Sequence, residues 1–290
     1  MKNLQLGLHK LLLLGLLMPV TGMAQVLYSS MPEPLPGSLP SVGYQASQTA
    51  EFGDHISFDG ASSTVGKVNV TMNSWACQES NWTADCAYPD VENTGYTHPI
   101  TLNIYEVNNA TTPPSVGALI TTVTEDFLVP WRPAKDVECD NGGYLPDCNN
   151  GYNFVISYDF GEAGIELPDE IIFGVAFNTQ TWGANPIGVD GPYTSLNFSV
   201  SEGATVGVDV DPDMVFWNTM TAGNYTDGGA AGVGVFRADT AWTDYVPAVQ
   251  FVAPFTEVAP IPANSTPALA LLVMLMLAGG WYFRGTMVRD

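Results

Sequence analysis

The chain has 290 residues, of which 8 are basic and 30 acidic, so its formal net charge at pH 7 is −22. A polypeptide this acidic repels the phosphate backbone of nucleic acids and anionic membrane surfaces, which excludes a nucleic-acid-binding function. The length is sufficient for one large β domain with a sizeable core, or for two small domains.

The first 24 residues have the three parts of a secretory signal peptide. Lys2 and Lys10 are followed by the apolar run Leu11–Met18, and small residues stand three positions before, and directly before, a cut after Ala24. An uncleaved membrane anchor is the alternative, but the apolar run is too short to span a bilayer comfortably. We therefore expect residues 1–24 to be a cleaved signal peptide.

Residues 25–48 are rich in Pro, Ser and Gly, with prolines at positions 32, 34, 36 and 40. This composition predicts a flexible or extended lead-in. His55 follows in a Gly-rich stretch that predicts a turn, and His98 precedes a proline at the expected entry to a strand. Neither histidine lies near a serine nucleophile motif, so we interpret both as surface or turn residues.

Residues 49–255 show strand periodicity. Apolar and polar residues alternate at 68–73, 100–104 and 154–159, and further candidate strands are 116–124, 169–177, 193–200, 205–210, 213–218, 231–237 and 246–254. Turn residues separate all of these runs, and no helical period occurs between the two hydrophobic termini. The pattern predicts an all-β fold, a β-sandwich of the jelly-roll-like type found in secreted proteins.

Four cysteines form two pairs, Cys77 with Cys86 and Cys139 with Cys148, each nine positions apart. Outside the cytoplasm these residues favour disulfides, and local pairing is the simplest of the three possible connectivities. A zinc site is the alternative, but the spacing is not CxxC and no histidine is near either pair.

The tryptophans Trp82, between the first two cysteines, and Trp182, in a Gly/Asn-rich loop, are candidates for binding a sugar. An indole ring can stack on a pyranose while nearby Asn and Asp side chains bond its hydroxyls. We assign Trp82, Trp182 and Asp190 as candidate ligand-binding residues, with packing inside the loops as the alternative.

The sequence Asp209-Val210-Asp211-Pro212-Asp213 places three carboxylates on alternate residues. In an extended segment these side chains point the same way, so Asp209, Asp211 and Asp213 are the candidate ligands of a structural calcium ion, with Asp190 as a further oxygen donor. An acidic β-turn with Pro212 at its corner is the alternative. Other close carboxylate pairs in this region are numerous enough to arise by chance.

The C-terminus combines a Pro-rich stalk at 256–267, an uncharged run at 268–283 and a basic end at 284–290. As a helix the run would be about 24 Å long, against about 30 Å for the hydrocarbon core. Arg284 and Arg289 place the end on the cytoplasmic side by the positive-inside rule. We predict a transmembrane or sorting helix; a buried helix of the domain is the alternative.

The segment Ile261–Leu272, followed by Ala278-Gly279-Gly280-Trp281 and a basic end, resembles the PEP-CTERM and IPTL-CTERM class of C-terminal sorting signals. This resemblance covers about the last 30 residues and implies handling by an exosortase-type membrane enzyme of a Gram-negative cell that makes exopolysaccharide.

These features together predict an exported, membrane-tethered or sorted surface or matrix protein. We expect it to be non-catalytic, with extracellular polysaccharide as its candidate ligand. A secreted glycan-cleaving enzyme that uses two carboxylates and a purely structural or adhesive protein are the alternative hypotheses.

Overall fold

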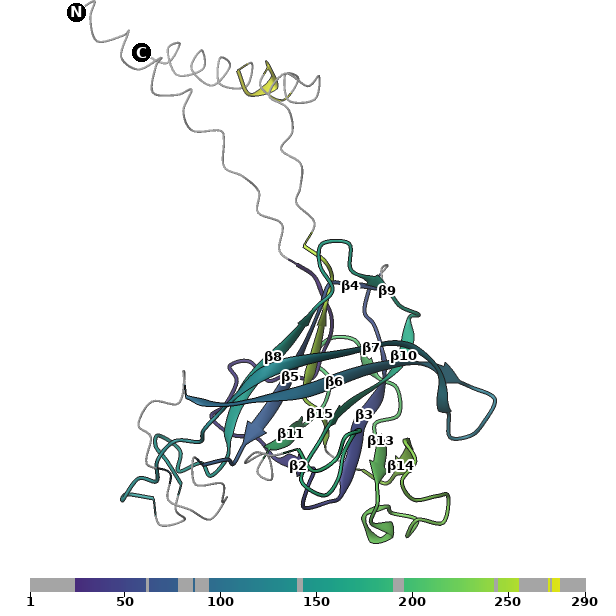
Figure 1. Ribbon diagram of the computed structural model, residues 1–290. Helices are drawn as coiled ribbons and strands as arrows, with labels where there is room; N and C mark the ends of the chain where they lie inside the picture. Colours follow the sequence, from purple (N-terminus) through teal and green to yellow (C-terminus); the bar gives the residue numbers. More distant parts are fainter. Residues whose placement is uncertain are drawn as a thin grey trace, which may run out of the picture. The chain divides into compact units, whose positions relative to one another are not determined.

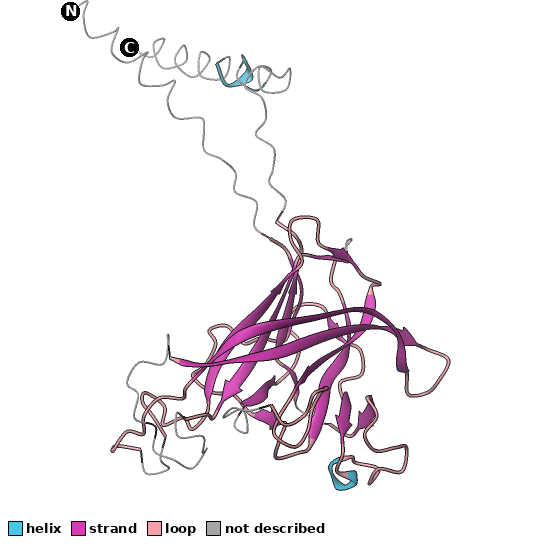
Figure 2. Cartoon of the chain, viewed as in Figure 1, coloured by secondary structure: helices cyan, strands magenta, loops and turns pink. Residues whose placement is uncertain are grey.

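The computed structural model describes residues 24–60, 63–77, 86, 94–139, 143–189, 196–242, 245–255, 271 and 273–276. The chain divides into two compact units, one formed by Ala24–Pro254 and the other by Met1–Met23 with Phe255–Asp290. The regular structure of the first consists almost wholly of strands, which loops connect (Figure 2), and the described residues beyond 270 are helical. Within the described ranges, no helix is both long enough and apolar enough to cross a membrane. The predicted signal peptide and most of the predicted tail fall outside these ranges.

The larger unit contains two seven-stranded antiparallel sheets, most of whose strands are labelled in Figure 1. Sheet 1 has the order β1-β16-β5-β11-β15, with β2 paired to β11 and β8 paired to β5. Its strands are β1 (Val26–Ser29), β2 (Ser41–Gly43), β5 (Lys67–Ser74), β8 (Tyr152–Asp159), β11 (Leu196–Ser201), β15 (Val246–Pro247) and β16 (Val249–Val252).

Sheet 2 has the order β14-β13-β3-β10-β6-β7, with β12 also paired to β3. Its strands are β3 (Thr49–Ser57), β6 (Gly95–Asn108), β7 (Ser115–Pro130), β10 (Glu170–Phe177), β12 (Val208–Asp209), β13 (Met214–Thr219) and β14 (Arg237–Thr240). A separate small ladder joins β4 (Thr64–Val65) to β9 (Ile165–Glu166), and the short 3-10 helix η2 covers Ala222–Asn224.

One hydrophobic core takes alternate side chains from both sheets. Val68 and Val70 of β5 belong to the same buried cluster as Leu102 of β6 and Phe173 of β10. The period-two pattern of these strands explains this, because every second side chain of a strand faces the same side. The fold is therefore all-β, with two antiparallel sheets enclosing a core in a manner consistent with a β-sandwich.

The prediction of strands at 68–73, 100–104, 154–159 and 169–177 is confirmed by β5, β6, β8 and β10. The prediction at 231–237 is wrong: residues 226–235 form turns and bends, and the next strand begins only at Arg237. Four glycines in that stretch have positive φ, including Gly232 at 123°, a conformation that a regular strand does not use.

The predicted lead-in at 25–48 is part of the fold. Strand β1 pairs with β16 and β2 pairs with β11, and the proline-rich segment between them packs onto the outer face of sheet 1. There the Asn153 side chain donates to the carbonyl of Pro36 at 3.0 Å, and its main-chain amide donates to that of Gly37 at 2.9 Å. The prolines stand between the strands, where they leave the ladder bonds intact. We call residues 31–40 the strap.

Candidate functional site

The ends of the larger unit lie next to each other, since the amide of Ala253 donates to the carbonyl of Gln25 at 2.8 Å. The same end of sheet 1 contains Lys67, the first residue of β5, which is paired with Val252. Strand β5 runs from there to Ser74, at the end from which the loop to the first disulfide departs. Gln25 and Ala253 therefore lie at one end of β5, and the first disulfide follows its other end (β5 is labelled in Figure 1).

Two disulfides close the loops at this distal end. Cys77 bonds Cys86 and Cys139 bonds Cys148, both with Cα atoms 5.3 Å apart, so the predicted local pairing is confirmed. The buried Arg132 contacts the first disulfide: its Nε donates to the sulfur of Cys86 at 3.1 Å. Its Nη1 donates to the carbonyl of Asn150, two residues after Cys148, at 3.3 Å. A single guanidinium thus joins the first disulfide to the segment that follows the second.

Trp182 lies in a loop at the same end, after β10 finishes at Phe177 opposite Ile100. Its amide donates to the hydroxyl of the buried Thr179 at 2.8 Å, and that hydroxyl donates back to the Trp182 carbonyl at 2.8 Å. The backbone that presents the half-buried indole is thereby fixed. The other two predicted ligand-binding residues, Trp82 and Asp190, lie outside the described residues.

His98 is a core residue rather than the expected surface or turn residue. It is 2% exposed, its Nε2 lies 2.9 Å from the carbonyl of Asn178, and its ring meets Phe177 edge-on. Burial lowers its pKa, so the neutral imidazole is favoured in the folded state. The following Pro99 is compatible with this position because the strand register continues through it to Asp126.

The acidic turn 209–213 occupies a gap in the edge of sheet 2. Strands β12 and β13 pair with the same edge of β3. Strand β12 pairs with Ile56 and Ser57, and β13 pairs with Thr49–Gly53. The turn between them faces the intervening Asp54 and His55. The Asp211 carboxylate lies 3.1 Å from the Nδ1 of His55, while Asp209 pairs with Ile56, a core residue.

His55 is likewise not a turn residue. It belongs to β3, is 1% exposed, and stands between two carboxylates, with its Nε2 3.6 Å from Glu170. The prediction of a turn was wrong because Gly53 lies within a strand, where the absence of a side chain lets the neighbouring strand approach closely. A Cβ on Gly53 would overlap the carbonyl of Phe173 on the neighbouring strand.

On the opposite face of β3, Asp54 points between the sheets. It is 1% exposed; one carboxylate oxygen accepts the amide of His55 at 2.9 Å, and the other has no hydrogen-bond partner. One oxygen of Asp209 and the hydroxyl of Tyr28 are also buried without a partner. Burial raises the pKa of Asp54 well above its usual range, and the charge of Asp209 adds to this. Burial likewise raises the pKa of Asp209 to about 6.

A pocket of about 450 Å³ opens beside Asp209. Its wall includes Glu202, Asp213 and Tyr245, together with the glycines and small residues of the loop 203–207. The three predicted calcium ligands are therefore divided: Asp209 and Asp213 line the same pocket, whereas Asp211 contacts His55. Across the described ranges, no three Asp, Glu, His or Cys side chains form a ready metal-binding group.

A second buried carboxyl, Glu51, lies on the outer face of sheet 2. Its Oε1 accepts hydrogen bonds from Asn103 at 2.8 Å and from Tyr105 at 2.9 Å. Burial raises the pKa of Glu51, although these two bonds lower it. The residue lacks any local sequence signal, because its partners come from another strand.

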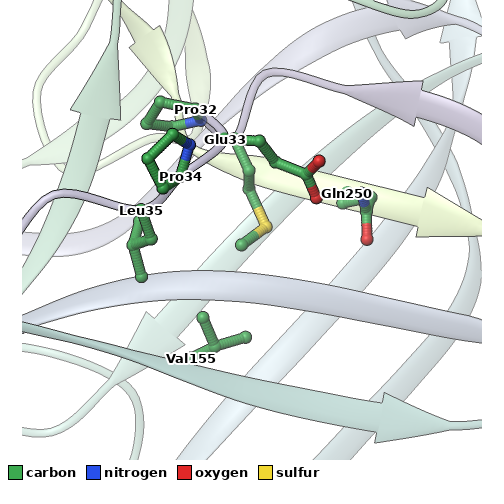
Figure 3. A pocket seen from close by; sticks show the side chains of 7 residues that line it. Pro32, Glu33, Pro34, Leu35, Val155 and Gln250 are labelled. Carbon is green, nitrogen blue, oxygen red and sulfur yellow. The ribbon is translucent and has the colours of Figure 1, made fainter.

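The strap forms one wall of another pocket, of about 550 Å³, on the outer face of sheet 1. Figure 3 shows Pro32, Pro34 and Leu35 on one side and Val155 of β8 on the other. Glu33 and Gln250 supply its polar groups. The pocket therefore offers a ligand few polar groups, one carboxylate and one amide beside apolar walls.

The predicted sugar-binding and calcium-binding residues are not brought together. Trp182 lies in the loop after the last residue of β10. Glu170, which lies beside His55, is the first residue of the same strand. About 23 Å of strand therefore separates the two places. The chain thus has two candidate sites at opposite ends of sheet 2. Comparison with protein-family models, with curated proteins and with solved structures gives no match for this chain.

Proposed function

We propose that the chain is an exported, non-catalytic protein of the cell surface or extracellular matrix. In this proposal a jelly-roll-like domain binds extracellular polysaccharide through its distal loops. The signal peptide is removed after Ala24, and the C-terminal tail tethers the domain or passes it to a sorting enzyme of the exosortase type. The observation that carries the proposal is the polarity of the domain, whose chain ends and disulfide loops lie at opposite ends.

The polarity fits a tethered protein, because a domain attached through Phe255 directs its opposite end away from the attachment. The two disulfides support an oxidising compartment outside the cytoplasm, where such bonds persist. The bonds of Arg132 to Cys86 and Asn150 support a surface whose shape is maintained before a ligand arrives, which reduces the entropy lost on binding.

The polysaccharide part of the proposal rests on Trp182. An exposed or half-exposed indole on a fixed backbone offers a flat apolar surface for a sugar ring, at a small cost in side-chain entropy. The net charge of −22 favours neutral polysaccharides, or acidic ones bridged by cations, over other polyanions.

The test is a pull-down of the exported full-length chain on insoluble and immobilised polysaccharides, neutral and acidic. We expect binding to at least one neutral polysaccharide and a loss of about tenfold or more in Trp182→Ala, since burial of a large apolar side chain contributes about 1.5–3 kcal/mol. Leu119→Ala is the control, because Leu119 is an exposed apolar residue of β7 that lines none of the candidate sites. Equal binding by both variants would place the ligand elsewhere, and absence of all binding would leave a structural or adhesive role.

A second candidate function has one observation in its favour. Asp209, with a pKa raised to about 6, shares a pocket with Asp213 and Glu202, and a carboxyl of raised pKa beside a second carboxyl group is the arrangement of a glycan-cleaving acid. Release of reducing ends from a polysaccharide by the wild-type chain, abolished in Asp209→Asn, would establish this enzyme. Polysaccharide binding without release of reducing ends supports the non-catalytic function.

A further inference from the structure

Among the described residues, the buried polar atoms without a hydrogen-bond partner include the hydroxyl of Tyr28, one oxygen of Asp54 and one oxygen of Asp209. Tyr28 and Asp54 are 0% and 1% exposed. Buried polar groups in folded proteins are nearly always bonded, so a cluster of orphaned ones indicates that a further atom belongs among them.

The register of the strands explains how these groups meet. Asp209 pairs with Ile56, and Asp54, two residues before Ile56 on β3, faces the same side. Tyr28 reaches the place from β1 of the opposite sheet. Burial raises the pKa of the Tyr28 hydroxyl, and the charges of Asp54 and Asp209 raise it further, which is consistent with both carboxylates lying near it.

The negative charge of this pair is not balanced by a basic side chain. Among the described residues, the ion pairs involve His55 with Glu170, His55 with Asp211, and Arg237 with Asp227. The imidazole of His55 lies on the other face of β3, held by Asp211. Two carboxylates that are close to each other and partly or wholly removed from water need a cation or a shared proton.

The site is open to ions through the pocket of about 450 Å³, whose wall includes Asp209. Glu202 and Asp213 on the same wall make the entrance negative, which favours the approach of cations. The oxygen-only set of donors suits a hard cation, and the tolerance of calcium for irregular coordination suits a site completed by water.

We propose that Asp54 and Asp209 bind a calcium ion between the two sheets, with water from the pocket as the remaining ligands. Asp54, which no sequence pattern singles out, is the buried anchor of this site, and Asp211 is not part of it. Two protein carboxylates and several waters give weak binding, in the range of about 0.1–1 mM that is typical of extracellular calcium modules. The site does not depend on the proposed polysaccharide binding.

The test measures thermal unfolding of the full-length chain, freed of metal with a chelator, in about 10 mM calcium chloride, a level above the expected dissociation constant. Magnesium chloride at the same concentration and sodium chloride at the same ionic strength are the reference salts. We expect calcium to raise the Tm by about 3 °C or more beyond both salts. Asp209→Asn should lose this difference, and equilibrium dialysis should show one fewer bound calcium per chain.

Asp126→Asn is the matched control, since it makes the same charge change at an exposed position of β7 and should retain the calcium effect. Asp54→Asn should behave as Asp209→Asn; if it does not fold, the partly exposed Asp209 still decides the question. An equal response to calcium and magnesium, or a calcium effect that persists in Asp209→Asn, would overturn the proposal. The proposal would also be overturned if the wild-type chain did not respond to calcium while Asp54→Asn gained stability. That result would mean that Asp54 and Asp209 share a proton instead of binding an ion.

Discussion

The carboxyl group of Glu51 lies directly over Gly174 of the neighbouring strand, in the space that a Cβ at position 174 would fill. Both residues face outward from sheet 2, and Glu51 reaches across Gly174 to Asn103 and Tyr105. The glycine is therefore what allows a carboxyl to be buried on this face.

Gly174→Ala should lower the free energy of unfolding by about 2 kcal/mol or more, because the new methyl displaces a buried, hydrogen-bonded carboxyl. Urea unfolding measures the change. In a Glu51→Ala background the same substitution should cost much less, since the overlapping atoms are gone. Equal costs in both backgrounds would show that the backbone, and not Glu51, is the obstacle.

Glu51→Gln should stabilise the protein in a pH-dependent way. Because burial raises the pKa of Glu51 in the folded state, the wild-type chain loses stability as pH rises through that pKa. Glutamine retains an oxygen that accepts from Asn103 and Tyr105 but never ionises. Urea unfolding at acidic and at mildly alkaline pH should therefore show a stability advantage for the variant that grows with pH. An advantage independent of pH would contradict this account.

The second disulfide should contribute to stability through its effect on the unfolded chain. Replacing Cys139 and Cys148 by serine removes a short closed loop, which on the loop-entropy model lowers the unfolding free energy by about 2–3 kcal/mol. Denaturant unfolding of this double variant, compared with the wild-type chain before and after reduction, measures the effect. A variant as stable as the oxidised wild type would show that the loop is closed without the bond.

The strap should be held less firmly when the Asn153 side chain is truncated. The Asn153 side chain donates to Pro36 and accepts from Asn73 at 2.8 Å and from Ser199 at 3.1 Å. Asn153→Ala removes the acceptor of Ser199 and the donor to Pro36, while Asn73 keeps its bonds to Ser38 and Leu39. We therefore expect a loss of about 1–2 kcal/mol and faster proteolysis within residues 31–40. Ser157→Ala, on the exposed part of the same strand, is the control and should leave both properties nearly unchanged.

Export can be checked on the chain itself. Secreted or surface-bound protein should begin at Gln25, with both cysteine pairs oxidised. Mass spectrometry of the intact protein and of its unreduced peptides measures both properties. Cytosolic protein that retains residues 1–24 and has free thiols would contradict the predicted extracytoplasmic localisation.

The regular part of the fold was predictable because β5, β6 and β8 each bury one face and expose or bond the other, which produces the alternation of residues. Strand β3 has no such alternation: Glu51, Asp54 and His55 are all buried, on both faces, beside a glycine that the sheet needs for close approach. Local residue preferences therefore predict a turn here. The stretch is instead buried by its pairing with β10 and β13, which are distant in sequence.

The candidate sites were predictable to different degrees. The local spacing of Asp209, Asp211 and Asp213 identified a place of concentrated negative charge, but not the directions in which the side chains point. The gap between β12 and β13 on the edge of β3 determines those directions, and it brings in Asp54. Similarly, equal cysteine spacing predicted the disulfides, whereas Arg132, which joins the first disulfide to the segment that follows the second, has no distinguishing neighbour in the sequence.

The contact between Gln25 and Ala253 also has a mechanical consequence. If the tail holds the domain while a ligand pulls on the distal loops, the force runs along the strands of sheet 1. The hydrogen bonds between antiparallel strands are perpendicular to that direction, so many of them resist in shear at the same time. A pull that separates the two chain ends would instead open the β1–β16 ladder one bond after another. The domain is built to bear load in the first direction and to yield in the second.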